Sequence, residues 1–220
     1  QSNDQLLMSS VKKAEQRGVY LFQKGAVDFD GKDFAQAENF MKQAHENGYR
    51  RSNIEYLVAN AQAQQAKYGD AMAWLRKAID AKSAAGETVD VSWYAQGANF
   101  ALKSKDDMAA NIWLKDLLRV DGKPAYWHDA LTIFMTSNDF DLQEKLDIMR
   151  LMRLTNAMLY EQDFATYLES VNPARYPDEA YSMLEEGFNK GVINRNTITF
   201  AEEWKVANGL LAESKANAAL

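Results

Sequence analysis

The feature that most constrains this chain is a pattern of small and apolar residues that recurs after 34 positions. An aromatic residue, two alanines and a long apolar residue take part: Phe34, Ala37, Met41 and Ala44 correspond to Tyr68, Ala71, Leu75 and Ala78. The last three positions of each copy are spaced i, i+4 and i+7, which places them on one face of a helix. A period of this length is typical of helical repeat arrays, in which each helix pair completes its core against its neighbours.

Less regular copies continue the pattern toward the end of the chain. The third copy carries Trp93, Gly97 and Ala110, and the fourth opens at Pro124, a residue suited to the first position of a helix. We therefore predict an all-α stack of about five helix pairs and a C-terminal capping helix, forming one domain over residues 1–220. The predicted pairs span 16–49, 51–84, 88–121, 124–154 and 160–192, and the capping helix spans 197–217.

Local signals refine some of these boundaries. Ser52 with Glu55, and Thr199 with Glu202, have the spacing of a capping box, so we expect a helix to begin at each. The capping helix should place Phe200, Trp204, Ala207 and Leu211 on one face. We also expect one additional residue in the first turn, at Gly31–Phe34.

This spacing resembles the tetratricopeptide repeat, in which a small residue of the first helix faces an alanine of the second. Gly25, Ala59 and Gly97 stand at the first-helix position. The resemblance implies a right-handed α-solenoid that binds a protein or peptide partner in a groove lined by the first helices. The groove positions that it implies are Phe22, Ala26, Asn53, Tyr56, Asn60, Gln64, Tyr94, Ala98, His128 and Thr132, with Phe29, Leu102 and Met135 beside them.

The last third also resembles a group of exported bacterial tetratricopeptide proteins. Three segments carry this likeness: Trp127-His128-Asp129-Ala130-Leu131, Arg150-Leu151-Met152-Arg153 and Leu184-Glu185-Glu186-Gly187-Phe188. The resemblance implies a periplasmic or envelope-associated protein, with the cytoplasm as the alternative. It also implies that the chain is the C-terminal part of a longer protein.

Charge and composition argue against several partners. The net charge is −6, whereas nucleic-acid binding depends on Lys and Arg that neutralise phosphates, so we expect no nucleic-acid partner. The pair Arg50 and Arg51 is interpreted as a solvated helix start. The chain has no cysteine, which excludes disulfides and thiol catalysis. No stretch is long and apolar enough to predict a membrane-spanning helix.

The residues do not predict an enzyme. His45 and His128 are the only histidines, they fall in different repeats, and no nucleophile pattern accompanies either. Asp28, Asp30 and Asp33 are clustered, but their spacing departs from a calcium loop and no closing glutamate follows. We therefore expect no catalytic residues, no cofactor and no metal.

Two functions remain open at this point. The first is a scaffold that holds a peptide or protein segment in the groove, since aromatic and amide side chains can anchor a main chain. A clamp for a terminal carboxylate is not predicted there, because Phe22, Tyr56 and Tyr94 occupy the positions that should carry cations. The alternative is a carrier or sensor of an apolar small molecule, enclosed by Phe22, Phe29, Tyr56, Tyr94, Leu102 and Met135.

Overall fold

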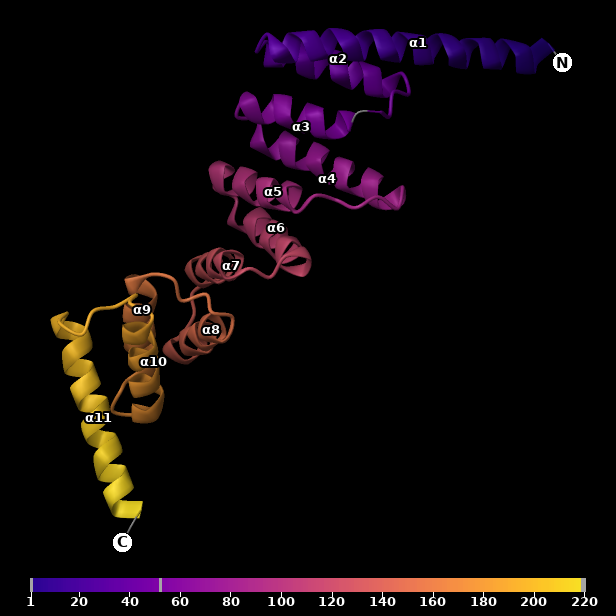
Figure 1. Cartoon of the computed structure of the whole chain (residues 1–220). Coiled ribbons are helices and arrows are strands. Elements are labelled where there is room, and N and C mark those ends of the chain that lie inside the picture. Colours follow the sequence, from indigo (N-terminus) through magenta and orange to yellow (C-terminus); the bar gives the residue numbers. More distant parts are fainter. Residues whose placement is uncertain (1, 52, 219–220) are drawn as a thin grey trace. The chain divides into compact units, whose positions relative to one another are not determined.

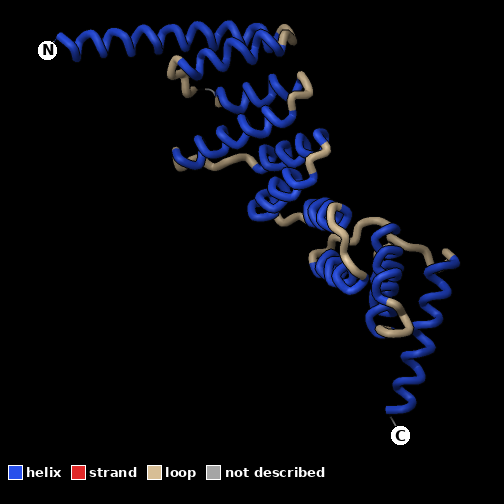
Figure 2. Tube along the Cα trace, turned by 180° about the vertical axis from the view of Figure 1, so that it is seen from behind, coloured by secondary structure: helices blue, strands red, loops and turns tan. Residues whose placement is uncertain are grey.

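The computed structural model of the chain describes the backbone of residues 2–51 and 53–218 and the side chains of 9–51 and 53–213. All regular structure in these residues is helical, and they contain no strand (Figures 1 and 2). The described part of the chain forms α1 (Ser2–Asp30), α2 (Phe34–Glu46), α3 (Ile54–Gln64), α4 (Tyr68–Ala84), α5 (Val91–Ser104), α6 (Asp107–Val120), α7 (Pro124–Thr136), α8 (Leu142–Leu154), α9 (Glu161–Val171), α10 (Pro177–Asn189) and α11 (Ile198–Ala218). The all-α prediction is confirmed for these residues.

The helices form two compact units, Gln1–Val120 and Asp121–Leu220, and we describe each by itself. In the first unit, consecutive helices pack against one another in sequence order, from α1 against α2 to α5 against α6. The second unit shows the same order from α7 to α11. This sequential packing is consistent with a helical repeat arrangement, with three helix pairs in the first unit and two pairs plus α11 in the second.

Small residues set the distance between the two helices of a pair. A Cβ added to Gly25 in α1 would lie 3.2 Å from the carbonyl oxygen of Ala37 and 2.9 Å from Cγ of Met41, both in α2. In the third pair, a Cβ on Gly97 would lie only 2.2 Å from the indole of Trp113. The alanines predicted at the repeated second-helix position, Ala37, Ala71 and Ala110, are all completely buried.

The turn inside each pair of the first unit repeats the same backbone geometry. Lys32, Ala66 and Lys105 have φ of 63°, 58° and 56°, in the left-handed region. The residue after each of them donates its backbone N–H five residues back, as Asp33 does to the carbonyl of Asp28 at 2.8 Å. Three residues separate α1 from α2, and three also separate α3 from α4. The prediction that the first turn has one additional residue at Gly31–Phe34 is therefore wrong.

Two helix starts differ from the predicted ones. Helix α1 begins at Ser2, well before the predicted repeat start at residue 16. Helix α11 begins at Ile198, so Thr199 lies inside its first turn and does not cap it; the carbonyl of Thr197 accepts the first helical hydrogen bond, from Ala201. The capping box predicted from Ser52 lies outside the described residues.

The second unit has a continuous core that extends from α7 to α11. Phe164, Met183 and Leu184 lie at its centre without measurable exposure. On α11, Phe200 and Ala207 are buried in this core and Trp204 packs against it, as predicted, whereas Leu211, the fourth residue of the predicted face, is partly exposed and does not belong to the core. The indole Nε1 of Trp204 also donates to Glu185 at 2.6 Å, which ties α11 to α10.

A carboxylate, Glu38, lies at the centre of a largely buried polar network that joins α2 to α3 and the turn after it. Its oxygens accept hydrogen bonds of 2.9 Å from Gln62, Gln65 and Lys67, and a further bond from Lys42. Burial raises the pKa of this carboxyl, but the bonds from the two lysines and two glutamines outweigh it and lower the pKa from 4.5 to about 2.

This lowered pKa predicts a specific loss of stability in acid. A carboxyl with a lower pKa in the folded state stabilises the fold above its unfolded pKa and loses that contribution as the pH falls toward 2. Glu38 should therefore contribute up to about 3 kcal/mol to the free energy of unfolding at pH 5, most of it lost by pH 2. Urea unfolding of wild type and Glu38→Gln at several pH values measures this, and equal pH slopes in the two proteins would contradict it.

The close approach of α5 and α6 gives a second prediction. Gly97→Ala should reduce the free energy of unfolding by about 1–3 kcal/mol, because its methyl group would overlap the Trp113 ring. Gly69→Ala in α4 is the matched control, since a Cβ there meets nothing within 4 Å and should gain up to about 1 kcal/mol of helix propensity. Denaturant unfolding of both variants checks the sign of each effect; a Gly97→Ala protein as stable as wild type would mean that this approach is not close.

Candidate functional site

In the first unit, two side-chain contacts join successive first helices, α3 and α5. The ring of Tyr56 stacks on Trp93 with centroids 4.4 Å apart and planes 9° from parallel. One turn along α3, Asn60 Oδ1 accepts a hydrogen bond of 2.9 Å from Gln96 Nε2. These four residues align α3 and α5, and Tyr56, Asn60 and Gln96 remain partly exposed.

The other predicted groove residues on these two helices differ in exposure. Ala98 is buried and serves the helix packing, whereas Tyr94 is partly exposed. Gln64 at the end of α3 and Leu102 near the end of α5 are exposed. Tyr94, next to Trp93 in sequence, is therefore an aromatic residue of α5 with accessible surface.

The sequence analysis named Tyr56 and Tyr94 as groove residues, which stand at equivalent repeat positions, but it missed Trp93 as the partner of Tyr56 and Gln96 as the partner of Asn60. Tyr56 and Tyr94 are 38 residues apart, the same interval that separates the small residues Ala59 and Gly97. Residues at equivalent repeat positions of neighbouring helices need not be in contact. Here the ring of Tyr56 contacts Trp93, the residue just before its equivalent Tyr94. An aromatic pair such as Trp93-Tyr94 in one repeat is a signal that could have suggested this offset contact.

The predicted groove residues of α1 face their own helix pair. Phe22 stacks on Tyr49, with centroids 4.5 Å apart, and Phe29 meets Phe34 edge to face at 5.3 Å. Ala26, between them on α1, is partly exposed. Each of these two aromatic rings therefore already packs against another ring of the protein.

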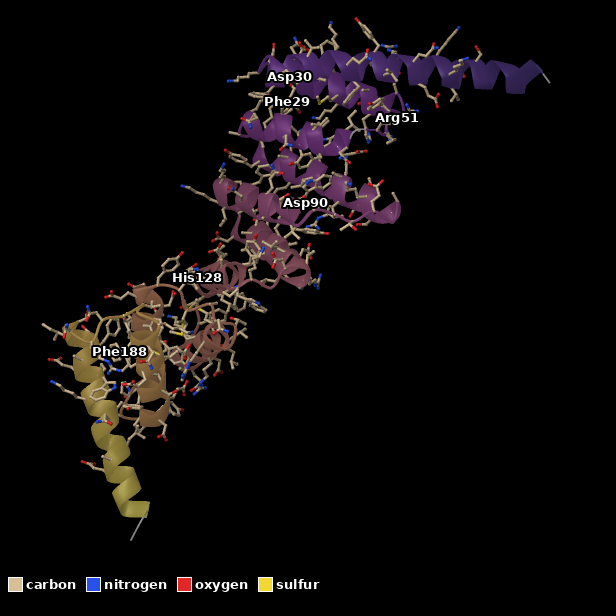
Figure 3. The ribbon with its side chains drawn as sticks, in the orientation of Figure 1. Phe29, Asp30, Arg51, Asp90, His128 and Phe188 are labelled. Atoms are coloured by element: carbon tan, nitrogen blue, oxygen red, sulfur yellow. The ribbon has the colours of Figure 1, made fainter. Side chains whose placement is uncertain are left out.

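Arg51 lies in the loop between α2 and α3, at the opposite end of the helix pair from Phe29 and Asp30 (Figure 3), and Asn53 belongs to the same loop. Asn53 has a left-handed φ of 51°, and no hydrogen bond from its side chain caps α3. It lines a pocket with Arg50, Arg51 and Lys82. The structure thus separates Asn53 from the contacts of Tyr56 and Asn60, although all three are close in sequence.

In the second unit, His128 of α7 bridges to the start of α9. Its Nε2 lies 3.2 Å from Oδ1 of Asp163, and its ring packs edge to face on Tyr160 at 4.9 Å. The other oxygen of Asp163 accepts the backbone N–H groups of Leu159 and Tyr160, both at 2.8 Å. His128 thus supports a helix start. Thr132, one turn further along α7, and Met135 are partly exposed.

His45 also pairs with a carboxylate. Its Nε2 lies 3.0 Å from Oε1 of the buried Glu55, which joins α2 to α3, and its ring packs against Trp74. Burial and the charge of Arg50 lower the pKa of His45, and together they outweigh the attraction of Glu55. Each histidine therefore has an evident structural role between two helices.

Of the three clustered acids Asp28, Asp30 and Asp33, the last has a structural role in capping a helix. The side chain of Asp33 accepts a hydrogen bond of 3.1 Å from the backbone of Gln36 and caps α2. Among the described residues, no group of three or more His, Asp or Glu side chains is placed to hold a metal ion. None of the described helices combines the length and apolarity needed to cross a membrane.

Comparisons with known proteins identify no family for this chain. No protein-family model matches it, and no curated protein matches it significantly.

The contacts of Asp163 predict that it matters more for stability than its histidine partner does. Asp163→Ala removes the acceptor for two backbone N–H groups as well as the partner of His128, and should lower the free energy of unfolding by about 1–2 kcal/mol. His128→Ala should cost less, because Asp163 keeps both backbone bonds. Denaturant unfolding of the two variants compares them; a larger loss for His128→Ala would contradict this ranking.

Proposed function

We propose that this protein is a non-enzymatic scaffold of the tetratricopeptide type, which binds a peptide or protein segment along the first helices α3 and α5. The observation that carries the proposal is the row formed by the Tyr56–Trp93 stack and the Asn60–Gln96 hydrogen bond. Rigid aromatic side chains supply apolar anchors, and half-exposed amides can exchange hydrogen bonds with a bound main chain.

Several local features support the tetratricopeptide assignment. Two adjacent helix pairs keep a 34-residue interval between Phe34 and Tyr68, the first residues of α2 and α4. Their turns share a left-handed residue and the same hydrogen-bond pattern. Small residues lie where the helices of a pair approach closely. A right-handed α-solenoid is the form that we assign to this array as part of the proposal.

The described contacts favour a segment over an enclosed apolar small molecule. Phe22, Phe29 and Tyr56 each pack against another ring of the protein, and Leu102 is 44% exposed. An enclosed ligand would need these surfaces to converge around it, whereas an extended or helical segment can lie along a row. The proposal includes a place in a bacterial envelope assembly, which rests on the sequence resemblance alone.

Replacing Tyr94 separates binding from folding better than replacing Tyr56. Tyr94→Ala should keep the fold, because Trp93 and not Tyr94 supports the stack, and should weaken capture of a partner by about tenfold or more if Tyr94 is an anchor. Tyr20→Ala is the matched control, since Tyr20 is a 61% exposed tyrosine on α1. Affinity capture from the native cell with the two variants, followed by titration of the captured partner, is the measurement.

The outcomes of that experiment differ clearly. Loss of capture by Tyr94→Ala, with wild-type helicity and normal capture by Tyr20→Ala, supports the first-helix face as the binding surface. Full-strength capture by a folded Tyr94→Ala, Gln96→Ala double variant would exclude it.

A further inference from the structure

An open polar pocket of about 250 Å³ lies where the loop between α2 and α3 meets the end of α4. Residues of three segments line it: Arg50, Arg51, Asn53, Glu55, Ala78, Ala81, Lys82, Ala85 and Glu87. The three alanines form a wall without long side chains, and the remaining lining residues are polar or charged. The pocket is thus shaped by small residues and framed by charge.

The charges of this pocket leave one cation without a partner. Glu55 is paired with His45 at 3.0 Å, and Lys82 with Glu87 at 2.9 Å. The carbonyl of Arg51 accepts a backbone hydrogen bond from Ile54, but its exposed guanidinium has no ion pair or hydrogen bond with any described residue. Three cations and two carboxylates give the pocket a formal charge of +1, in a chain whose net charge is −6.

The neighbouring Arg50 is held in place by the backbone. Its Nη1 donates to the carbonyl oxygens of His45 and of Tyr49, the latter at 3.0 Å. A guanidinium carries five N–H donors, so donors remain for a ligand after these two bonds. Because the protein already orients this side chain, binding a ligand would cost little additional side-chain entropy.

We propose that this pocket binds a carboxylate of an acidic peptide segment, with Arg51 and Arg50 as its partners. The planar fork of a guanidinium matches the two oxygens of a carboxylate. A carboxylate carries one negative charge and would bring the formal charge of the pocket from +1 to 0. A phosphate dianion would add a second negative charge, which Glu55 and Glu87 would repel. The volume and the alanine wall suit the side chain of Asp or Glu or the end of a peptide.

The site is distinct from the row of side chains on α3 and α5, and the inference does not depend on the function proposed for that row. Tyr94 and Gln96 do not line the pocket, and Lys82, whose Nζ lies 5.6 Å from the centroid of the Trp93 ring, is its one lining residue with a described contact to the Tyr56–Trp93 stack. Each proposal can therefore fail while the other holds.

Titration of the labelled protein by NMR, at pH 7 and low salt, tests the inference with four probes. The probes are acetyl-Ala-Glu-Ala-amide, its Gln counterpart, acetyl-Ala-Ala-Ala with a free terminal carboxylate, and inorganic phosphate. The Glu peptide, the free-carboxylate peptide or both should shift the backbone resonances of the loop around Arg51, and the Gln peptide should not. The comparison of the first and third probes decides whether a side-chain or a terminal carboxylate is preferred.

His45 supplies a second readout of the same event. The charge of Arg50 helps to lower the pKa of this imidazole. A bound carboxylate would oppose that charge and stabilise the protonated ring, so the pKa of His45 should rise when the active peptide is present.

Substitutions at Arg51 make the test decisive. Arg51→Ala should weaken binding of the active peptide about tenfold, and Arg51→Lys should weaken it less, since it keeps the charge but loses the fork. Arg119→Ala, which removes an exposed arginine of α6, should bind as wild type does. Unchanged affinity in a folded Arg51→Ala, equal binding of the Gln peptide, or tighter binding of phosphate than of either carboxylate would each overturn the proposal.

Discussion

The close approach of two helices at a small residue is the constraint on which the α1–α2, α5–α6 and α9–α10 pairs depend. In α1 and α5 a glycine allows the second helix to lie against the backbone, and Met41 and Trp113 occupy the space that a side chain would fill. The second unit uses the same solution in α10, where a Cβ on Gly187 would lie 2.5 Å from the ring of Phe164. Once the pairs are this close, the alanines of the second helices become buried and the first helices come within reach of one another.

Polar side chains then fix how one pair stacks on the next. In the second unit, Arg150 of α8 forms two hydrogen bonds with Glu179 of α10, at 2.8 and 2.7 Å, and Arg153 donates to Glu186. The phenol of Tyr167 also donates to Glu179 at 2.6 Å, and burial together with this bond raises the tyrosine pKa. These bonds have a defined direction, so they select one stacking register among the many that apolar surfaces alone would accept.

The sequence predicted the parts of the fold that follow from local periodicity, and it missed contacts between distant residues. Ala37, Ala71 and Ala110 were identifiable because small residues at a fixed interval have one simple explanation. The network of Glu38 was not, because Gln62 and Lys67 lie 24 and 29 residues away and each resembles an ordinary surface residue. For the candidate site, Tyr56 and Asn60 were named, but not their partners Trp93 and Gln96. Arg50 and Arg51 were read as a solvated helix start, and only the position of Lys82 and the alanines of α4 shows the pocket that they line.

The sequential packing of helices within each unit also bears on how the chain reaches this structure. Each helix finds its main backbone contacts in the helix immediately before or after it, so the loops that must close during folding are short. Topologies with such local contacts fold fast, and no single pair has to form before the others. Folding can therefore nucleate at different helix pairs in different molecules and propagate from there to the same final array.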